Sequence, residues 1–575
     1  MTDTQPHPGP SRRRFLTGMG LTGAGVVATT LGAASSSAAA AAATPQTAGA
    51  PSDPGNFGRM FPDLSPFAKA NDAVRAALQE VGKQGGIMDA LDRLAAGPTA
   101  LITDPSVNGN PTSTNPYGTN PDNPTMTAGS TFVGQFTDHD ITFDQTSHLG
   151  ISQNPLTSPN ARTPALDLDS VFGGGPGIRP NLYVLNPDGS VGPQLKIGTG
   201  GVHEDVPRTA NGDGTYDAIL GDPRNDENVM IAGLHCAHIL FYNRVLSELG
   251  SIDLSPFPAA RGADLSNAHD QFLIARQITL WHYQWLLVNE HLAQIAGQAM
   301  VSNVLTKGNK FYKPKAGNAF MPIEFAAACY RFGHSIVRPS YRANFTSGTG
   351  DSTSPTANPF FALVFDTPFS GPINSDRGDL LGGYPAARRY IGWQTFFDFG
   401  DGQVKNNKKI DTKLSSVLFT LPLPAIAPGG QTTPLVLPQR NLLRQLTWGL
   451  PSGQEVAKAM GVPPLKPGDM GGIADVYKPF GSSTPLWYYI LAEAKAASGG
   501  VTLGPIAGRI VTETLIGLLR ADANSYLSAK PGWTPFLGAD LQLGSNLNPN
   551  ITGNRSYTRA HFLYYAQVVT PGTYR

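Results

Sequence analysis

The chain has 575 residues, with 42 lysines and arginines, 42 aspartates and glutamates, and no formal net charge. This balance offers no basic groove for nucleic acid and no strong field for a charged polymer. Charged residues make up 15% and hydrophobic residues 40%, which excludes wholesale disorder and favours one large domain with flanking segments. The 65 glycines and 49 prolines predict many ordered loops around a helical core.

The first 44 residues are typical of an export signal. The sequence Ser-Arg-Arg-Arg-Phe-Leu at 11–16 precedes a mildly apolar run, 19–34, and a stretch of alanines. This arrangement resembles a twin-arginine signal, which directs folded proteins across the bacterial inner membrane. The alternative is a disordered basic tail or a membrane anchor. No later run reaches the ~20 apolar residues that span a bilayer. A secreted or periplasmic protein without a stable membrane span is therefore predicted.

Residues 45–56 are expected to be a linker, and residues 57–535 to form one mainly α domain with few short strands. Hydrophobic spacing predicts helices at 127–139, 225–249, 264–296 and 322–337. Polar segments rich in proline, glycine, asparagine and threonine at 105–124, 346–359 and 428–434 are expected to be surface loops. Residues 536–575 are expected to be a C-terminal extension, to which the sequence gives no role.

The helix expected at 127–139 has one polar face. Gln135, Asp138 and His139 are spaced i, i+3, i+4 and so share a side of the helix, whereas Asp140 points elsewhere. A single histidine in such a helix is usually a hydrogen-bonded core residue. Three polar groups on one face, next to Phe132, instead favour a functional site.

Other metal sites are poorly supported. The stretch around Asp138 and Asp144 lacks the glycine and terminal glutamate of an EF-hand loop. His235 and His238 have no third or fourth ligand at zinc-site spacing, so they are interpreted as helix residues. The chain has two cysteines, Cys236 and Cys329, in apolar helical sequence. Two buried small side chains are favoured over a disulfide between them.

Four separate segments resemble the animal-type haem peroxidases of the peroxidase–cyclooxygenase superfamily, in a bacterial secreted form. The resemblance covers roughly residues 57–534. In chain order the segments are Gly134–Asp140, Pro223–Glu227 with His235 and Asn243–Arg244, Tyr330–His334, and Asn441–Arg444 with Gly449–Pro451. The first matches that family's distal helix, and the third its proximal segment. The resemblance implies a haem b cofactor, and hydrogen peroxide with small organic donors, halides or thiocyanate as reactants.

The resemblance also implies a role for each matched residue. His139, Arg224 and Gln135 are the expected catalytic residues, and His334 is the expected iron ligand with Asn441 as its hydrogen-bond partner. The expected haem-binding set further contains Arg331, together with two carboxylates that form ester links to the haem in animal peroxidases, Asp138 and Glu227.

General chemistry agrees with these roles. A haem requires an axial nitrogen ligand, an apolar slot and a polar distal side. A neutral imidazole such as His139 can take the proton from bound peroxide and return it to the leaving oxygen. Arg224 supplies a permanent positive charge where negative charge develops. Asn441 is a neutral acceptor for the second nitrogen of His334.

A calcium site follows from the same resemblance, because residues 163–173 are similar to the family's calcium loop. The implied ligands are all oxygen atoms, as a hard cation requires. They come from Asp140, Thr163, Asp167, Asp169 and the carbonyl group of Ala165. Without the resemblance, aspartates at alternate positions would be interpreted as a turn or a helix cap.

Two departures from the family pattern are Asn228, where some members have a haem-linked methionine, and Val133, where tryptophan is frequent. Two alternatives to a peroxidase remain. A fatty-acid dioxygenase of the same superfamily uses a tyrosine three residues before the proximal histidine; here that residue is Arg331, and Tyr330 is turned about 100° away on an α-helix. The second alternative is a secreted haem-bearing adhesion protein without enzymatic activity. The oligomeric state is not predicted.

Overall fold

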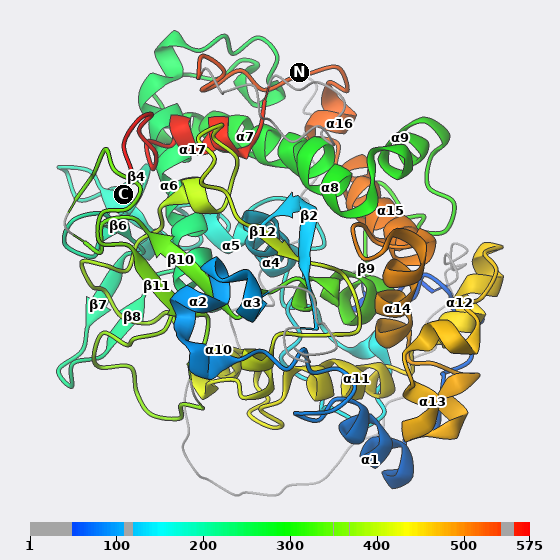
Figure 1. Ribbon diagram of the computed structural model, residues 1–575. Helices are drawn as coiled ribbons and strands as arrows, with labels where there is room; N and C mark the ends of the chain where they lie inside the picture. The colour runs from blue at the N-terminus through cyan, green and yellow to red at the C-terminus, as the bar shows by residue number, and fades with distance from the viewer. Residues whose placement is uncertain (1–48, 54, 109–118, 349, 367, 542–556) are drawn as a thin grey trace, which may run out of the picture. The chain divides into compact units, whose positions relative to one another are not determined.

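The computed structural model describes residues 49–575 except 54, 109–118, 349, 367 and 542–556 (Figure 1). The expected export signal lies outside the described residues. Residues 47–575 form one compact unit, which includes the described part of the segment after residue 535. The unit is mainly α, as predicted.

The longer helices include several that are mostly buried. Their bounds are α1 Asp72–Val81, α4 Gly129–Ile141, α6 Val229–Glu248, α7 Ala268–Leu286, α9 Gln298–Lys307, α11 Leu437–Thr447, α12 Gly453–Met460, α14 Leu486–Ser498 and α15 Pro505–Ala521. Shorter helices are α2 Gly97–Thr103, α3 Pro105–Asn108, α5 Asp169–Phe172, α8 Leu292–Ala296, α10 Leu423–Ile426, α13 Ile473–Val476, α16 Tyr526–Ala529 and α17 Arg559–Tyr565.

The strands are short and occur only in pairs within the described residues. The parallel pair is β1 Phe57–Gly58 with β9 Met321–Pro322. The antiparallel pairs are β2 Asp122–Thr127 with β12 Asn406–Lys408, β3 Tyr183–Leu185 with β4 Val191–Leu195, β5 Gly198–Thr199 with β6 Glu204–Asp205, β7 Arg208–Ala210 with β8 Tyr216–Ala218, and β10 Ser340–Asn344 with β11 Phe360–Leu363.

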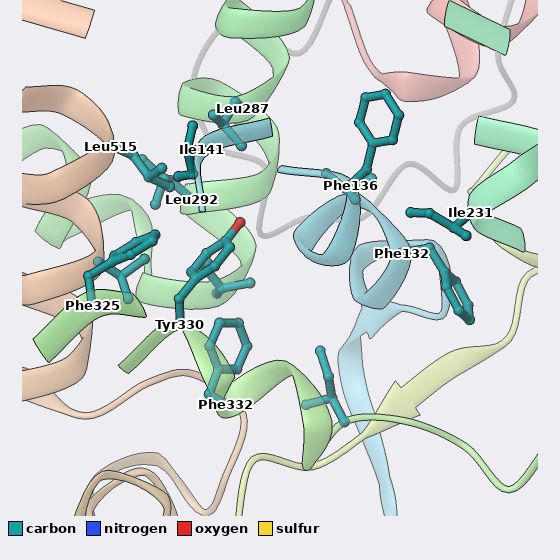
Figure 2. Close-up of a cluster of buried hydrophobic side chains, with 14 of the residues drawn as sticks. Phe132, Phe136, Ile141, Ile231, Leu287, Leu292, Phe325, Tyr330, Phe332 and Leu515 are labelled. Atoms are coloured by element: carbon teal, nitrogen blue, oxygen red, sulfur yellow. The ribbon is translucent and has the colours of Figure 1, made fainter. Parts of the chain in front are cut away.

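Helix α4 is the predicted distal helix, shifted by two residues because 122–127 pairs as β2. Its first residue, Gly129, allows a close approach: a Cβ there would lie 2.4 Å from Cζ of Phe397. Phe132 and Phe136 are buried beside the polar face. Figure 2 shows both rings in the same buried cluster as Tyr330 and Phe332.

Helix α6 begins later than predicted. Asn228 has an extended backbone, and its side-chain oxygen accepts the N–H of Ile231 at 3.0 Å, which caps the helix. Arg224 therefore lies before α6 in a 3₁₀ turn, Pro223–Asp226, and Glu227 is the residue that ends this turn. Neither residue lies in the first turn of α6. The stretch Val229–Ser251 is long and apolar enough to cross a membrane, but 72% of its most apolar window is buried within the fold, as in a core helix.

The two other predicted helices are interrupted. The expected helix 264–296 consists of α7, a π-helical turn at Leu287–His291 and α8, which follow one another in Figure 1. The expected α-helix 322–337 is wrong: Pro322 belongs to β9, a π turn covers Glu324–Ala328, and a 3₁₀ helix covers Cys329–His334. The buried carboxylate of Glu324 accepts the N–H groups of Met60 and Phe61, so a distant segment fixes this irregular backbone.

The C-terminal segment packs on α6. The ring of Phe562 in α17 stacks on Phe241 at a centroid distance of 4.1 Å, and Arg244 donates to the carbonyl oxygen of Tyr565 at 2.9 Å. Residues 557–575 are thus part of the core structure. Both cysteines are buried and free, which confirms the interpretation as small buried side chains.

Candidate functional site

A cavity of about 250 Å³ lies between α4 and the proximal segment, defined here as Cys329–His334. Its walls are partly apolar, with Phe365, Leu418 and Ile426 among them. Seven predicted site residues from distant parts of the chain line it: Gln135, Asp138, His139, Arg224, Glu227, Arg331 and His334. Asp140 is not among the lining residues, in agreement with the predicted face of the helix.

His139 lies in the last turn of α4 and is 4% exposed. Its Nδ1 atom is 2.8 Å from Oδ1 of Asn225, whose Nδ2 atom lies 3.1 Å from Nδ1 of His235. Burial, reinforced by the nearby Arg224, lowers the pKa of His139 to about 3. The imidazole is therefore neutral at physiological pH and able to accept a proton from a reactant.

Arg224 is fixed beside His139 by several hydrogen bonds. Its Nε and Nη2 atoms donate to the carboxylate of Asp222 at 3.1 and 2.8 Å, and Nη2 also donates to the carbonyl oxygens of His139 and Thr142. The guanidinium lies 3.9 Å from the ring centroid of Phe143. Burial alone would raise the pKa of Asp222, but Arg224 and Arg162 hold it well below its usual range. The cation is thus paired and oriented before any reactant arrives.

Gln135 is held by two partners from the α6 side. Its Nε2 atom donates to Glu227 at 3.2 Å, and its Oε1 atom accepts from Asn228 at 3.3 Å. Burial raises the pKa of Glu227 to about 7, although Arg224 opposes this shift. Glu227 therefore titrates near neutral pH. Only one of its carboxyl oxygens, Oε2, accepts the hydrogen bond from Gln135.

Asp138 is the second carboxyl group of the cavity wall. Its Oδ1 atom accepts the hydroxyl hydrogen of Thr142 at 2.9 Å. Burial raises its pKa, while the guanidinium groups of Arg331 and Arg224 oppose the shift. Two partly buried carboxyl groups thus face the cavity, Asp138 from α4 and Glu227 from the turn before α6.

His334 lies opposite, at the end of the proximal segment. Its Nδ1 atom is 2.7 Å from Nδ2 of Asn441 on α11, so its Nε2 atom is left for another partner. Burial and the nearby Arg331 lower the pKa of His334 to about 3, which keeps the imidazole neutral as metal ligation requires. The amide of Asn441 donates in this orientation, whereas the predicted role requires its oxygen to accept; that oxygen faces Nη1 of Arg331 at 3.4 Å.

Arg331 is a partly buried cation at the same end of the cavity. Its Nε atom donates to the carbonyl oxygen of Ala326 at 2.9 Å, and burial followed by repulsion from Arg444 lowers its pKa to about 10. Arg440 and Arg444 line the cavity as well. This end therefore suits an anionic group, such as a carboxylate of a cofactor or substrate.

Tyr330 occupies the position next to the one expected of a dioxygenase tyrosine. Because the proximal segment is 3₁₀, with ~120° per residue, Tyr330 does not share a direction with His334. Its hydroxyl lies 3.3 Å from Nε2 of His291, and Nδ1 of His291 lies 3.2 Å from Oγ of Ser130. The residue lines the cavity, but its hydroxyl group is engaged with His291 in the π turn.

The predicted calcium loop lies next to α4. The buried Asp140 accepts the N–H of Leu168 at 3.1 Å and the hydroxyl hydrogen of Ser170 at 3.4 Å. Burial, then repulsion from Asp167 and Asp169, raises the pKa of Asp140 well above its usual value. Like charges therefore converge here, as at a cation site. However, the described residues contain no group of three or more histidine, cysteine or acidic side chains that could hold a metal ion.

The sequence interpretation missed three residues that organise the site. Asn225 and Asp222 hold His139 and Arg224, and Asn228 both caps α6 and binds Gln135. Asp222 and Asn228 flank the Arg224 turn, and their side chains cap a 3₁₀ turn and a helix, respectively. The capping pattern Asp-Pro followed by Asn-Val was a usable signal for the turn; the contact between Asn225 and His139 depends on packing alone.

Comparison with known proteins relates part of the chain to one protein family. Residues 144–365, which include Arg224, Glu227 and His334, match the family model described as animal haem peroxidase. A human protein named probable oxidoreductase PXDNL is 28% identical over 131 residues. That match covers 23% of this chain and 8% of the human protein, so this chain spans less than a tenth of that relative's length.

Solved structures share the fold. Peroxidase A from Dictyostelium discoideum has a TM-score of 0.53 at 16% identity, covering 84% of this chain and 91% of that one. A fatty acid alpha-dioxygenase from Arabidopsis thaliana has a TM-score of 0.51 at 15% identity, covering 90% and 76%. The Oryza sativa fatty acid alpha-dioxygenase has a TM-score of 0.53 at 13% identity, covering 90% and 80%.

The matched family agrees with the geometry of the cavity, whose walls carry the groups that a haem site requires. Residues 144–365 of the chain are thus similar to the animal haem peroxidases.

Proposed function

We propose that this protein is a haem peroxidase that reduces hydrogen peroxide and oxidises small organic donors, halides or thiocyanate. One observation carries the proposal: a single cavity has the neutral His139 and the paired Arg224 on one side and the neutral His334 on the other. A proton acceptor, a fixed cation and a nitrogen ligand facing one space are the groups that peroxide cleavage at a haem requires.

The residues present fit a haem. His334 would hold the haem iron through Nε2, and Arg331, with Arg440 and Arg444, would supply positive charge for the carboxylates of the haem. Asp138 and Glu227 are the candidates for ester links to the macrocycle, since each has a carboxyl group on the cavity wall. When bound, the haem would supply the electrons that break the O–O bond.

The distal side chains then handle the proton and the charge. His139 accepts the proton of the inner peroxide oxygen at Nε2 and delivers it to the outer oxygen, which leaves as water. Arg224 stabilises the negative charge on the departing oxygen without itself losing a proton. The amide of Gln135, held between Glu227 and Asn228, orders water or a halide in the cavity.

Calcium and the location of the protein belong to the same proposal. Calcium bound by Asp140, Thr163, Ala165, Asp167 and Asp169 would offset the burial and the repulsion that together raise the pKa of Asp140. An export signal in residues 1–44 would place the enzyme outside the cytoplasm.

The test is a turnover assay on the haem-loaded protein. The expected result is peroxide-dependent oxidation of a phenol, iodide, bromide or thiocyanate. Tight haem binding without any turnover would instead support the haem-bearing adhesion protein, and absence of haem binding would contradict both.

A fatty-acid dioxygenase is the second candidate. The shared fold of the plant alpha-dioxygenases and the position of Tyr330 on the cavity wall favour it. Arg331 at the position expected for the radical tyrosine, and the engagement of Tyr330 with His291, count against it. Rapid oxygen uptake with a polyunsaturated fatty acid, without phenol or halide oxidation, would decide for this candidate.

A further inference from the structure

Two buried residues outside the cavity connect to the distal histidine. Asn225 is 0% exposed and His235 is 1% exposed, and neither lines the cavity. Asn225 lies in the 3₁₀ turn before α6, and His235 lies in the second turn of α6. The contacts form a chain from His139 through the Asn225 amide to His235, at 2.8 and 3.1 Å.

The amide makes the proton positions on the two rings depend on each other. Oδ1 of Asn225 can only accept, so Nδ1 of His139 carries the hydrogen and Nε2 keeps its lone pair. Nδ2 of Asn225 can only donate, so Nδ1 of His235 is the acceptor and its hydrogen is on Nε2. The reversed amide would place a hydrogen on Nε2 of His139 and remove the proton acceptor from the cavity.

We propose that Asn225 and His235 are positioning residues that fix His139 as the Nδ1–H tautomer, with Nε2 free to accept a proton. The inference rests on the proposed peroxidase function and adds how its proton acceptor is prepared. A buried neutral ring has two tautomers of similar energy, so an outer partner decides between them. None of the three linked side chains, His139, Asn225 and His235, is charged. The hydrogen-bond chain therefore selects the tautomer without adding a charge that would have to be buried.

The first test reads the tautomer directly. The full chain, labelled with ¹⁵N-histidine and loaded with diamagnetic zinc protoporphyrin, is examined by ¹H–¹⁵N correlation through two bonds; the signal of His139 is assigned by its loss in His139→Gln. We expect the Nδ1–H pattern for His139 and the Nε2–H pattern for His235. A predominant Nε2–H form of His139 would overturn the proposal.

The second test uses variants of the chain. Asn225→Leu removes both hydrogen bonds, and we expect His139 to become a mixture of tautomers. Asn225→Asp keeps an acceptor for Nδ1–H and should keep the tautomer. If Asn225→Leu does not fold, His235→Leu and His235→Asn form the same comparison one step further out, because asparagine can still accept from Asn225. An unchanged His139 spectrum in both Asn225→Leu and His235→Leu would contradict the proposal.

A third readout is the rate of cyanide binding to the haem-loaded protein, because hydrogen cyanide must give up its proton to bind. Asn225→Leu should slow this association by ~10–100-fold, the usual effect of losing an outer hydrogen-bond partner. The matched control is Asn160→Leu. The buried amide of Asn160 accepts from the N–H of Phe143 and donates to the carbonyl oxygen of Ile141, at the end of α4, and neither bond involves a histidine. Equal slowing in both variants would show general damage to α4 and overturn the specific role.

The outcomes are distinguishable from failure of the proposed function. If the chain binds no porphyrin, the peroxidase proposal fails, while the tautomer of His139 is still measured in the chain alone. If the haem-loaded protein turns over peroxide but His139 is in the Nε2–H form, the function stands and this inference fails.

Discussion

The two sides of the cavity are built differently. On the distal side, a regular helix and a capped turn present His139 and Arg224, and each is tied to the protein by its own hydrogen-bond partners. On the proximal side, a π turn followed by a 3₁₀ helix presents His334, whose side-chain partner is one amide, Asn441. Each histidine is thus held by one amide, Asn225 or Asn441, and only Arg224 is fixed by several hydrogen bonds. The two sides therefore differ mainly in the backbone that presents the histidine.

The largest effect is expected on the proximal side. His334→Ala should abolish normal haem binding or leave the haem with altered coordination, because no other described histidine lines the cavity on that side. The measurement is the haem content and absorption spectrum of the purified variant. His282→Ala is the control: His282 is a buried histidine that bonds the carbonyl oxygen of Ile278 and does not line the cavity. An unchanged spectrum in His334→Ala would remove the ligand assignment.

The distal side should respond in rate and keep the haem. His139→Ala should slow the reaction with peroxide by ~10²–10⁴-fold, the usual contribution of a general acid–base group. Arg224→Ala should slow it by ~10²–10³-fold through lost electrostatic stabilisation. Stopped-flow mixing with peroxide measures both rates. Arg162→Ala is the control, since Arg162 pairs with the same Asp222 at 2.7 Å but does not line the cavity. A wild-type rate in His139→Ala would end the distal assignment.

Covalent attachment of the haem is expected on the distal side, because both candidate groups for ester links, Asp138 and Glu227, lie there. After peroxide turnover, acidified organic extraction should leave haem on the protein. Glu227→Gln and Asp138→Asn should each remove one link, and the double variant should release all of it. Mass spectrometry of the haem peptides identifies the links. Complete release of unmodified haem from the wild-type protein would contradict the prediction.

Bound calcium should stabilise α4, the helix that carries His139 on the distal side. Asp167→Ala should reduce the calcium content and lower the melting temperature by several degrees, because a ligand that binds only the folded state stabilises it by mass action. Atomic emission and thermal unfolding with and without a chelator provide the measurements. Calcium-free protein with full stability and full activity would refute the site.

The smallest effect is a pH dependence of stability. Burial raises the folded-state pKa of Glu227 from 4.5 to about 7, so its contribution to stability is present below pH 4.5 and lost as the pH rises through 7. In haem-free protein, Glu227→Gln should therefore be more stable than wild type at pH 8, by roughly 1–3 kcal/mol, and no more stable at pH 4. Denaturant unfolding at the two pH values tests the sign. Equal differences at both would mean that Glu227 does not titrate as described.

The regular and the irregular backbone on the two sides of the cavity also differ in how well the sequence predicted them. The spacing of Gln135, Asp138 and His139 predicted their common face because α4 is a regular helix, where spacing determines direction. The same reasoning failed for 322–337, where the buried contact of Glu324 with Met60 and Phe61 imposes a π turn. It also misplaced the start of α6, although Asn228 is a recognisable cap. Asn225 gave no signal in the sequence, since its role arises only when α4 packs against the turn before α6.

The most direct test of the central claim is one optical experiment on the haem-loaded wild-type protein: its absorption spectrum before and after one equivalent of hydrogen peroxide. The account predicts a histidine-ligated haem spectrum that changes rapidly with peroxide and returns to the starting form when a phenol or iodide is added. A haem spectrum that does not respond to peroxide, or a protein that takes up no haem, would contradict it.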